Sequence, residues 1–453
     1  MRQFLFSGLL VSVCLPLSSA VALGQSASVS ASALDGSQGS SSGSSQDAGT
    51  SASDLVINLL PDDYDSGAES QSGSRSESVT PEQAKGRTAQ AIGPYDPLGI
   101  RLGQFLLYPS LTLWGEVTDN VDGTANGEEG RIVTPEAELR VETDWSRHAL
   151  DLSARGAISA YDAPVRKPDT EENLSAELRL DLADETQLTL DGGFAHSKEE
   201  SSVELTATGQ AATYETNVTG GATLDHRAGL LDLQLRGSAG AMRYENESSR
   251  DYDSYRLGAR IGVPVTDQII PFIDAEIARR SYNDASQRQN GDSLRGAIGI
   301  EVVNREKLSG EISAGVIAWE PDLAGLSGDT AMFADASLVW SPNGLWTIRG
   351  GLETDLTSTA TAARSVATHS VSLSADYALL RNLNIVASGE ISRESYNGLS
   401  RRDWVLDAAL NATYSFNRTL QLIASVERSQ RESNWAGEDT TTSTVRVGLK
   451  IQR

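Results

Sequence analysis

The sequence of 453 residues is poor in the side chains that build most metal and redox sites. It has one cysteine, Cys14, three methionines and four histidines. The histidines His148, His196, His226 and His369 are scattered, with no HExxH pattern and no cysteine partner, so no metal-ligand spacing is present. We therefore expect no metal, no cofactor and no catalytic cluster, and we predict that the protein is not an enzyme.

Positive charge and long apolar runs are also scarce. The 37 lysines and arginines face 62 aspartates and glutamates, which gives a net charge of −25. A phosphate backbone must be met by clustered lysine and arginine, so no nucleic-acid partner is expected. A helical protein with several membrane spans would need repeated runs of roughly 20 apolar residues, and these are missing. A membrane β-barrel is not excluded, because only every second side chain of its strands faces lipid.

Residues 1–24 predict a secretory signal peptide. Arg2 supplies a positive start, an apolar run extends from Phe4 to Leu17, and small residues follow. The alternative is an uncleaved anchor helix. Cys14 lies inside the apolar run, so a lipoprotein site is not expected. Removal of this segment leaves a chain without cysteine, which fits a protein exported into a Gram-negative envelope.

Residues 25–92 have a different composition. Eighteen of them are serine, and alanine, glycine, aspartate and glutamine are frequent. Such a stretch cannot bury enough apolar area to offset the entropy of ordering, so it predicts a disordered tail. Within residues 54–65, apolar residues from Leu55 to Leu60 cluster between acids. We expect a transient hydrophobic patch there, with a docking segment as the alternative.

From residue 93 to the end, apolar and polar residues alternate almost without interruption. Leu231, Leu233 and Leu235, for example, alternate with Asp232 and Gln234. A period of two indicates β-strands. Each strand therefore has one apolar face and one polar or charged face.

The connections between these strands alternate in length. Short ones such as residues 144–148 and 379–382 are followed by polar ones of about 10 to 20 residues, such as 119–131 and 429–442. About 18 strands, with 16 to 18 as the range, of about 10 to 13 residues each are typical of an outer-membrane barrel. The predicted fold is all-β: a transmembrane antiparallel up-and-down β-barrel over residues 93–453, with the tail in the periplasm.

A β-propeller is the main alternative fold, because its blades also repeat at about 40 residues. It would need four short strands per blade and a recurring blade motif, and the sequence has neither. A β-sandwich or a β-solenoid is a further alternative. Closure favours the barrel, because in lipid every backbone polar group must be paired.

The polar face of the strands would line the lumen of the barrel. Charges of both signs on this face must be hydrated or paired, and a barrel of 16 to 18 strands is wide enough for an aqueous channel. We expect a pore; the alternative is a barrel filled by ion pairs. The predicted pore-lining residues are Glu138, Arg140, Glu142, Arg155, Glu177, Arg179, Asp232, Arg236, Arg256, Arg260, Glu276, Arg295, Glu311, Arg349, Glu353, Glu427 and Arg446.

One pair of residues invites an enzymatic interpretation. Asp225 and His226 are adjacent, as in the acid–histidine pairs of outer-membrane hydrolases. The predicted position of this pair is a short turn on the periplasmic side. We therefore expect an ordinary turn pair.

The beginning of the alternating region carries the most specific pattern. It reads YDPLGIR at 95–101 and FLLYPSL at 105–111, followed by Glu116, Asp119, Asn120 and Val121. Together with VRVGLKIQR at 445–453, this pattern resembles the putative β-barrel porin 2 family. The resemblance implies an outer-membrane barrel of the kind found in alphaproteobacteria and their relatives, where some members are associated with exopolysaccharide export. It brings no catalytic residues with it.

The expected function is porin-like passage of hydrophilic solutes or polysaccharide across the outer membrane. Expected partners are outer-membrane lipid, the barrel-assembly machinery, and polysaccharide or periplasmic export proteins. The alternative is a structural or interaction barrel whose long surface loops or periplasmic tail bind glycans or an export complex.

Overall fold

A computed structural model describes residues 94–162, 167–199, 213–283, 290–304, 307–323, 325–358, 363 and 365–453. The predicted signal peptide and the predicted tail of residues 25–92 lie outside these residues. In the described part of the chain, no helix is long and apolar enough to span a membrane. The chain there consists of strands joined by turns and loops.

In chain order the strands are β1 (Ile100–Leu102), β2 (Phe105–Thr118), β3 (Gly130–Thr143), β4 (His148–Tyr161), β5 (Asp169–Ala183), β6 (Thr186–Lys198), β7 (Tyr214–Ala228), β8 (Leu231–Tyr244), β9 (Tyr252–Gly262), β10 (Ile269–Tyr282), β11 (Gly291–Asn304), β12 (Leu308–Pro321), β13 (Asp329–Asn343), β14 (Trp346–Ser358), β15 (Ser365–Leu380), β16 (Leu383–Asn397), β17 (Arg402–Ser415), β18 (Leu420–Ser433) and β19 (Thr440–Gln452).

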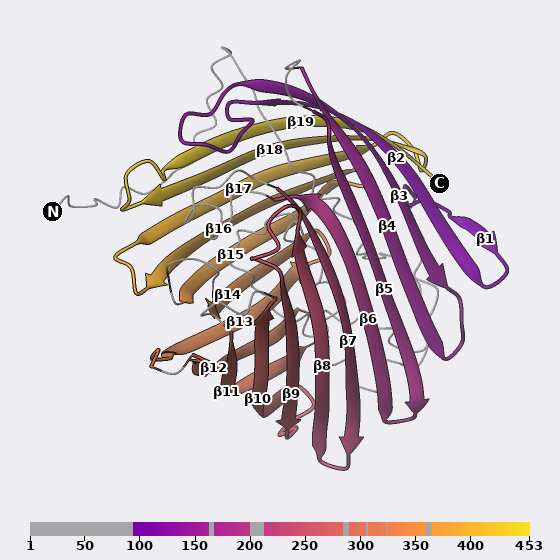
Figure 1. The fold of residues 1–453 in the computed structure, drawn as a ribbon. Helices are drawn as coiled ribbons and strands as arrows, with labels where there is room; N and C mark the ends of the chain where they lie inside the picture. Colours follow the sequence, from indigo (N-terminus) through magenta and orange to yellow (C-terminus); the bar gives the residue numbers. More distant parts are fainter. Residues whose placement is uncertain are drawn as a thin grey trace.

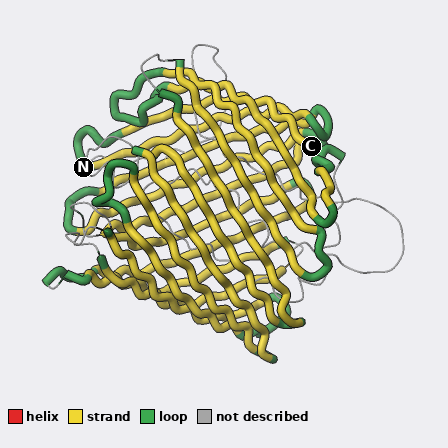
Figure 2. The backbone as a smooth tube through the Cα atoms, turned by 45° about the vertical axis from the view of Figure 1, so that its right-hand side comes forward, coloured by secondary structure: helices red, strands yellow, loops and turns green. Residues whose placement is uncertain are grey.

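Strands β2 to β19 form one closed sheet. Each strand pairs antiparallel with the next, and β19 pairs with β2 to close the ring (Figure 1). The strands are strongly tilted, as closure of a sheet requires (Figure 2). The predicted antiparallel barrel of 18 strands is therefore confirmed. The short strand β1, which the sequence did not predict, forms a hairpin with the start of β2.

The short and long connections lie at opposite ends of the barrel. Residues 184–185, 229–230 and 381–382 are among the short turns. Gly229 has a φ of 66°, a conformation that a tight hairpin turn needs and that glycine adopts without strain. We refer to this end as the turn end and to the opposite end as the loop end. Because the number of barrel strands is even, β2 starts and β19 finishes at the turn end.

The strands are longer than predicted and the long connections are shorter. The lengths of the barrel strands β2 to β19 run from 11 residues in β9 to 16 in β15, and residues 398–401 alone join β16 to β17. The segment from 429 to 433, predicted as loop, continues strand β18. The sequence prediction ended strands where apolar residues ended. Pairing continues further, because polar side chains are tolerated on both faces once a strand leaves the apolar band.

The barrel inverts the arrangement of a soluble protein. Large apolar side chains such as Leu111, Ile273 and Ile298 point outward and are 63%, 64% and 68% exposed, whereas Glu136 and Arg446 point inward and are buried. A continuous exposed apolar surface of this kind is unfavourable in water and suits contact with lipid. The side chains that fill the inside of the wall are polar or charged.

The two faces of β15 provide a direct test of this arrangement. Leu373 points outward near the middle of the strand, and its neighbour Ser372 points inward, opposite Glu390. We expect Leu373→Arg to lower the free energy of unfolding by about 2–4 kcal/mol, since it places a charge in lipid. The matched variant Ser372→Arg places the same charge beside Glu390 and changes stability by less than about 1 kcal/mol. Denaturant unfolding of both variants in lipid vesicles measures the difference; equal effects would contradict the assignment of the faces.

Candidate functional site

The inward face of the barrel is the surface on which the predicted functional residues meet. Residues that are direct cross-strand partners point to the same face, so the register fixes the orientation of each side chain. Glu138 opposes Arg155, for example, and Glu276 opposes Arg295. The register places every residue of the predicted pore-lining set on this inward face, with Glu353 placed by its pairing to β15. A role for these residues in lining an open pore stays a prediction.

One group of inward charges joins β8, β9, β10 and β12. Arg236 and Arg260 both contact Asp274, with N···O distances of 2.9 and 3.2 Å. Arg260 also binds Glu311 at 2.7 Å, and its guanidinium lies 3.9 Å from the ring centroid of Phe272. Asp274 is nearly fully buried, so its charge is tolerated because two arginines surround it.

A second group of inward charges lies where the barrel closes. Arg446 in β19 is 3.5 Å from Glu116 in β2, and Lys450 in β19 is 3.0 Å from Glu138 in β3. These pairs link the last strand to the first two long strands. They reinforce the ladder between β19 and β2, which closes the barrel.

The ion pairs of both groups run along the wall. Lys450 reaches two strands away, and Arg260 reaches three. A pair of this reach follows the circumference of the barrel rather than crossing its diameter. In the alternative, ion pairs fill the lumen and connect opposite walls. Such pairs would have to join strands much further apart around the barrel than the strands joined by these two groups.

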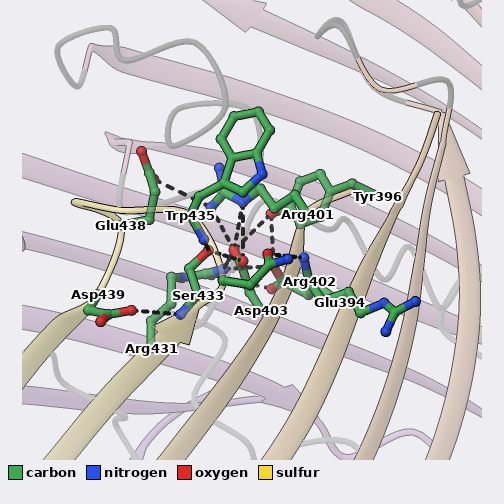
Figure 3. Close-up of polar contacts among 11 residues, drawn as sticks. Glu394, Tyr396, Arg401, Arg402, Asp403, Arg431, Ser433, Trp435, Glu438 and Asp439 are labelled. Carbon is green, nitrogen blue, oxygen red and sulfur yellow. Dashed lines mark hydrogen bonds and ion pairs between the residues drawn. The ribbon is translucent and has the colours of Figure 1, made fainter. Parts of the chain in front are cut away.

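A third charged cluster lies at the loop end of β16, β17 and β18 (Figure 3). Arg401 binds Asp403 at 2.5 Å, and Arg431 binds Glu394 at 2.6 Å and Asp403 at 3.1 Å. The side chains of Arg401, Asp403 and Glu394 have no exposed area. The Tyr396 hydroxyl donates to Glu394 at 3.0 Å. Two guanidinium groups and two carboxylates therefore neutralise one another in a closed space.

The same cluster fixes two of the surface loops. Arg401 belongs to the connection between β16 and β17, and it also contacts Glu438 and the ring of Trp435 in the connection between β18 and β19. None of its charged members is in the predicted pore-lining set. The alternating pattern could have identified Arg431, because it lies four residues beyond the predicted Glu427 and therefore on the same face of β18. It could not have found Arg401, which precedes the strand.

The wall departs from a regular ladder between β13 and β14. On the loop side their pairing ends at Ala336 opposite Leu352, and within the described residues no pair joins 329–335 to 353–358. The end of β14 contacts the inner face of other strands instead. Arg280 of β10 donates to the carbonyl of Ser358 at 2.8 Å, and Arg295 of β11 donates to the carbonyl of Thr354 at 3.4 Å. This part of β14, with β15 still paired to it, is therefore folded into the lumen.

Apolar packing accompanies this inward fold. Leu356 continues the outward, lipid-facing alternation of β14, yet it is only 5% exposed. It packs in one cluster with Ala297, Ile317, Trp319 and Phe333, which are apolar residues on the inward face of β11, β12 and β13. We call this group the lumen apolar cluster. It explains why these three strands carry apolar residues on a face that is otherwise polar.

The four histidines lie on four different strands, β4, β6, β7 and β15. Among the described residues, no group of three or more His, Cys, Asp or Glu side chains could hold a metal ion. Asp225 and His226 lie within β7 and not in a turn as predicted. Asp225 points inward and accepts a hydrogen bond from Gln234 at 2.9 Å, whereas His226 points outward and pairs with Thr186. Adjacent residues of a strand face opposite sides, so the two cannot act as an acid–histidine pair.

The loop-end charged cluster gives a stability prediction. Asp403→Ala leaves two buried arginines with one carboxylate fewer, and removal of one partner from a buried charge network costs about 3–5 kcal/mol. The control Asp439→Ala removes an exposed carboxylate that only accepts the Ser433 main-chain N–H, and its expected cost is about 1 kcal/mol. Denaturant unfolding in lipid vesicles compares them. A smaller effect for Asp403→Ala than for Asp439→Ala would show that the cluster does not stabilise the loop end.

Comparison with known proteins bears on the family. No protein of curated function matches the chain. Solved structures similar to it include OpdL of Pseudomonas aeruginosa, with 14% identity, a TM-score of 0.42, and coverage of 78% of this chain and 99% of that one. OccK9 (OpdG) of Pseudomonas aeruginosa has 12% identity, a TM-score of 0.44, and coverage of 77% and 98%. Neither assigns a solute to this chain.

The family profile described as putative beta-barrel porin 2 matches residues 93–453, which is the whole of the barrel. A closed barrel with an apolar outer face and a polar lumen is what an outer-membrane porin requires. The chain is an outer-membrane β-barrel and belongs to the putative beta-barrel porin 2 family.

Proposed function

We propose that the barrel allows passive, porin-like diffusion of hydrophilic solutes across the outer membrane, with no covalent chemistry. The observation that carries this proposal is the inward face. It holds charges of both signs that pair along the wall, as in the Arg236–Asp274 pair, and do not reach across the lumen. A barrel of 18 strands is wide enough for water and small polar solutes to pass between such walls.

A polysaccharide is the larger solute that we include in the proposal. Its support is a hydroxyl-rich stretch on the inward face of β15 and β16, where the register sets serines beside one another. Hydroxyl groups can exchange hydrogen bonds with a sugar chain without holding it by charge. The serines of this stretch are Ser370, Ser372, Ser374, Ser388 and Ser392.

In this proposal, the lengths of the connections between strands determine which end of the barrel faces the periplasm. Outer-membrane barrels have short turns on the periplasmic side and longer loops outside. The turn end of this barrel is then periplasmic, and the hairpin of β1 with the start of β2 lies at that end. This supports a periplasmic location for the predicted tail of residues 25–92 and an exported precursor with residues 1–24 as its signal peptide.

The second candidate function is an interaction barrel that conducts little. The inward-folded end of β14 favours it, because this segment occupies space inside the lumen and is held there by Arg280 and Arg295. The loops fixed by the loop-end charged cluster would then offer a stable surface for a glycan or an export complex.

Single-channel conductance in a planar bilayer separates the two candidate functions. We expect steady, porin-sized conductance from the refolded mature protein and from a variant that lacks residues 25–92. Conductance only in the shortened variant would make the tail a plug. A folded barrel that conducts in neither form would refute passive diffusion and favour the interaction barrel.

We further propose that the inward-folded end of β14 sets the width of the passage. If the β13–β14 ladder were extended in its existing register, Met332 would oppose Leu356 on the lipid face, where apolar residues belong. Both residues suit that position, and Met332 is already 82% exposed there. The sequence of β14 is thus compatible with a position in the wall as well as in the lumen.

A disulfide tests this second proposal. Direct cross-strand partners lie within the range that a disulfide can bridge, so Met332→Cys with Leu356→Cys can fix the end of β14 in the wall. Cys14 is the only cysteine of the chain and lies in the predicted signal peptide, so no native cysteine of the mature protein can form a competing disulfide. We expect the oxidised protein to conduct more than the reduced protein, with each single cysteine variant unaffected by reductant. A disulfide that forms without changing conductance would show that this segment does not limit passage.

A further inference from the structure

The outward face of the barrel changes character at the loop end of β16, β17 and β18. Below this level the outward side chains are apolar and exposed, as in Ile391, Leu406 and Val426. Toward the loop end, the next outward residues of β16 and β18 are arginines. Arg393 stands two residues beyond Ile391, and Arg428 stands two residues beyond Val426. The change marks the upper edge of the surface that lipid tails can cover.

Three arginines and one tryptophan lie on the outward face of β16 to β18 toward the loop end, and we call them the outer basic patch. Arg428 is the lowest of them, because it pairs with Ala408, four residues from Trp404 toward the turn end. Arg393 is the direct cross-strand partner of Trp404, and its guanidinium lies 5.8 Å from the centroid of that ring. Arg402 lies two residues from Trp404 on the same face of β17. Arg428 is on the neighbouring strand β18, where its guanidinium donates to the Ser443 hydroxyl at 3.2 Å. The patch thus spans three adjacent strands.

Three other outward cations at the loop end have carboxylate partners, which the arginines of the patch lack in the described part of the chain. Lys198, Arg243 and Arg279 each form an ion pair, with Asp169, Asp253 and Asp292 respectively, at 2.5 to 3.1 Å. Among the residues that the structure describes, no carboxylate lies within ion-pair distance of the patch arginines. The nearest acid in the register is Glu432, the partner of Trp404, and it accepts a hydrogen bond from Gln430. The patch therefore has an excess of positive charge, although the whole chain is strongly acidic.

The position of the patch limits what can bind there. Its side chains point away from the lumen, so a solute inside the barrel cannot reach them. Arg393 and Arg402 lie beside Trp404, a residue suited to the boundary between lipid tails and water. Arg428 lies lower, at the level of Ala408 and next to the apolar outward side chains. A ligand that contacts both levels needs acyl chains for the apolar surface and an anionic headgroup for the arginines. Guanidinium groups match phosphate in geometry as well as in charge.

We propose that the outer basic patch is a binding site for a phosphorylated glycolipid of the outer leaflet. Arg393, Arg402 and Arg428 bind its phosphate groups, and Trp404 lies at the level of its sugar headgroup. The acyl chains cover Ile391, Leu406 and Val426. This site lies outside the lumen and does not depend on passive diffusion through the barrel. It depends on the loop end facing the outer leaflet.

Binding of purified lipopolysaccharide tests the proposal. The full mature chain is stripped of lipid in a neutral detergent and titrated with lipopolysaccharide, and bound lipid is counted by native mass spectrometry. We compare wild type with the triple variant Arg393→Gln, Arg402→Gln, Arg428→Gln. Each arginine near an anionic lipid surface contributes about fivefold to affinity, so the triple variant is expected to bind on the order of 100-fold more weakly.

The control variant is Arg243→Gln with Arg279→Gln, which removes two outward arginines of the loop end that already have carboxylate partners. Its affinity is expected to stay within about threefold of wild type. Two ligand controls separate the chemistry: lipopolysaccharide stripped of phosphate is expected to bind as weakly to wild type as the intact lipid binds to the triple variant. Inorganic phosphate at millimolar concentration is expected not to displace the intact lipid.

Four results would overturn the proposal. The triple variant could bind as tightly as wild type, or the control variant could lose as much affinity as the triple variant. Removal of phosphate from the lipid could leave its affinity unchanged, which would mean that the arginines do not bind the phosphate groups. Displacement of the lipid by inorganic phosphate would identify a site for free anions instead of a lipid site.

Discussion

The need to pair every backbone polar group in lipid determines the rest of this structure. Unpaired N–H and C=O groups each cost several kcal/mol in a membrane, so a spanning sheet must close on itself. Closure brings β19 to β2, which among the described strands is the one ladder between strands distant in sequence. Arg446 and Lys450 reinforce this ladder by binding Glu116 and Glu138. Once the sheet is closed, lipid surrounds its outer face, so the polar half of each alternating strand must turn inward. The charged lumen is a consequence of closure.

The β13–β14 junction is instructive because the ladder between these two strands covers only their turn-side part. Where the ladder ends, the Thr354 main-chain N–H donates to the Asp335 carboxylate at 3.1 Å, so a side chain replaces the missing main-chain partner. Two exceptions to alternation then match each other. Leu356 is a lipid-type residue inside the barrel, and Phe333 is an apolar residue on a polar face, and both belong to the lumen apolar cluster. Each exception alone would be unfavourable. Together they bury apolar area, which indicates that the inward fold is a stable feature of this sequence and not an irregularity.

Sequence alternation was enough to predict the barrel and the inward face, because period two is a local property. Residues as far apart as Glu138 and Arg446 lie on the inward face of their strands, because alternation within one strand is enough to separate its two faces. It failed where neighbours decide the outcome. Asp225 and His226 were placed in a turn because polar residues end an apolar run, although pairing with β6 and β8 continues through them. The inward fold of Leu356 depends on partners in β11 to β13, and the sequence of β14 alone does not indicate these partners.

Two consecutive arginines show that neighbouring residues can lie on opposite sides of the barrel wall, in different environments. Arg401 and Arg402 have the same side chain, yet Arg401 is fully buried against Asp403 and Arg402 is exposed on the outer face. A buried guanidinium must be matched by carboxylates, since an unpaired one would cost far more than it could contribute. An exposed one at the edge of the lipid carries no such requirement, and its charge stays available to a ligand. The inward arginines therefore serve the stability of the barrel, whereas the outward arginines of β16 to β18 can be spared for recognition.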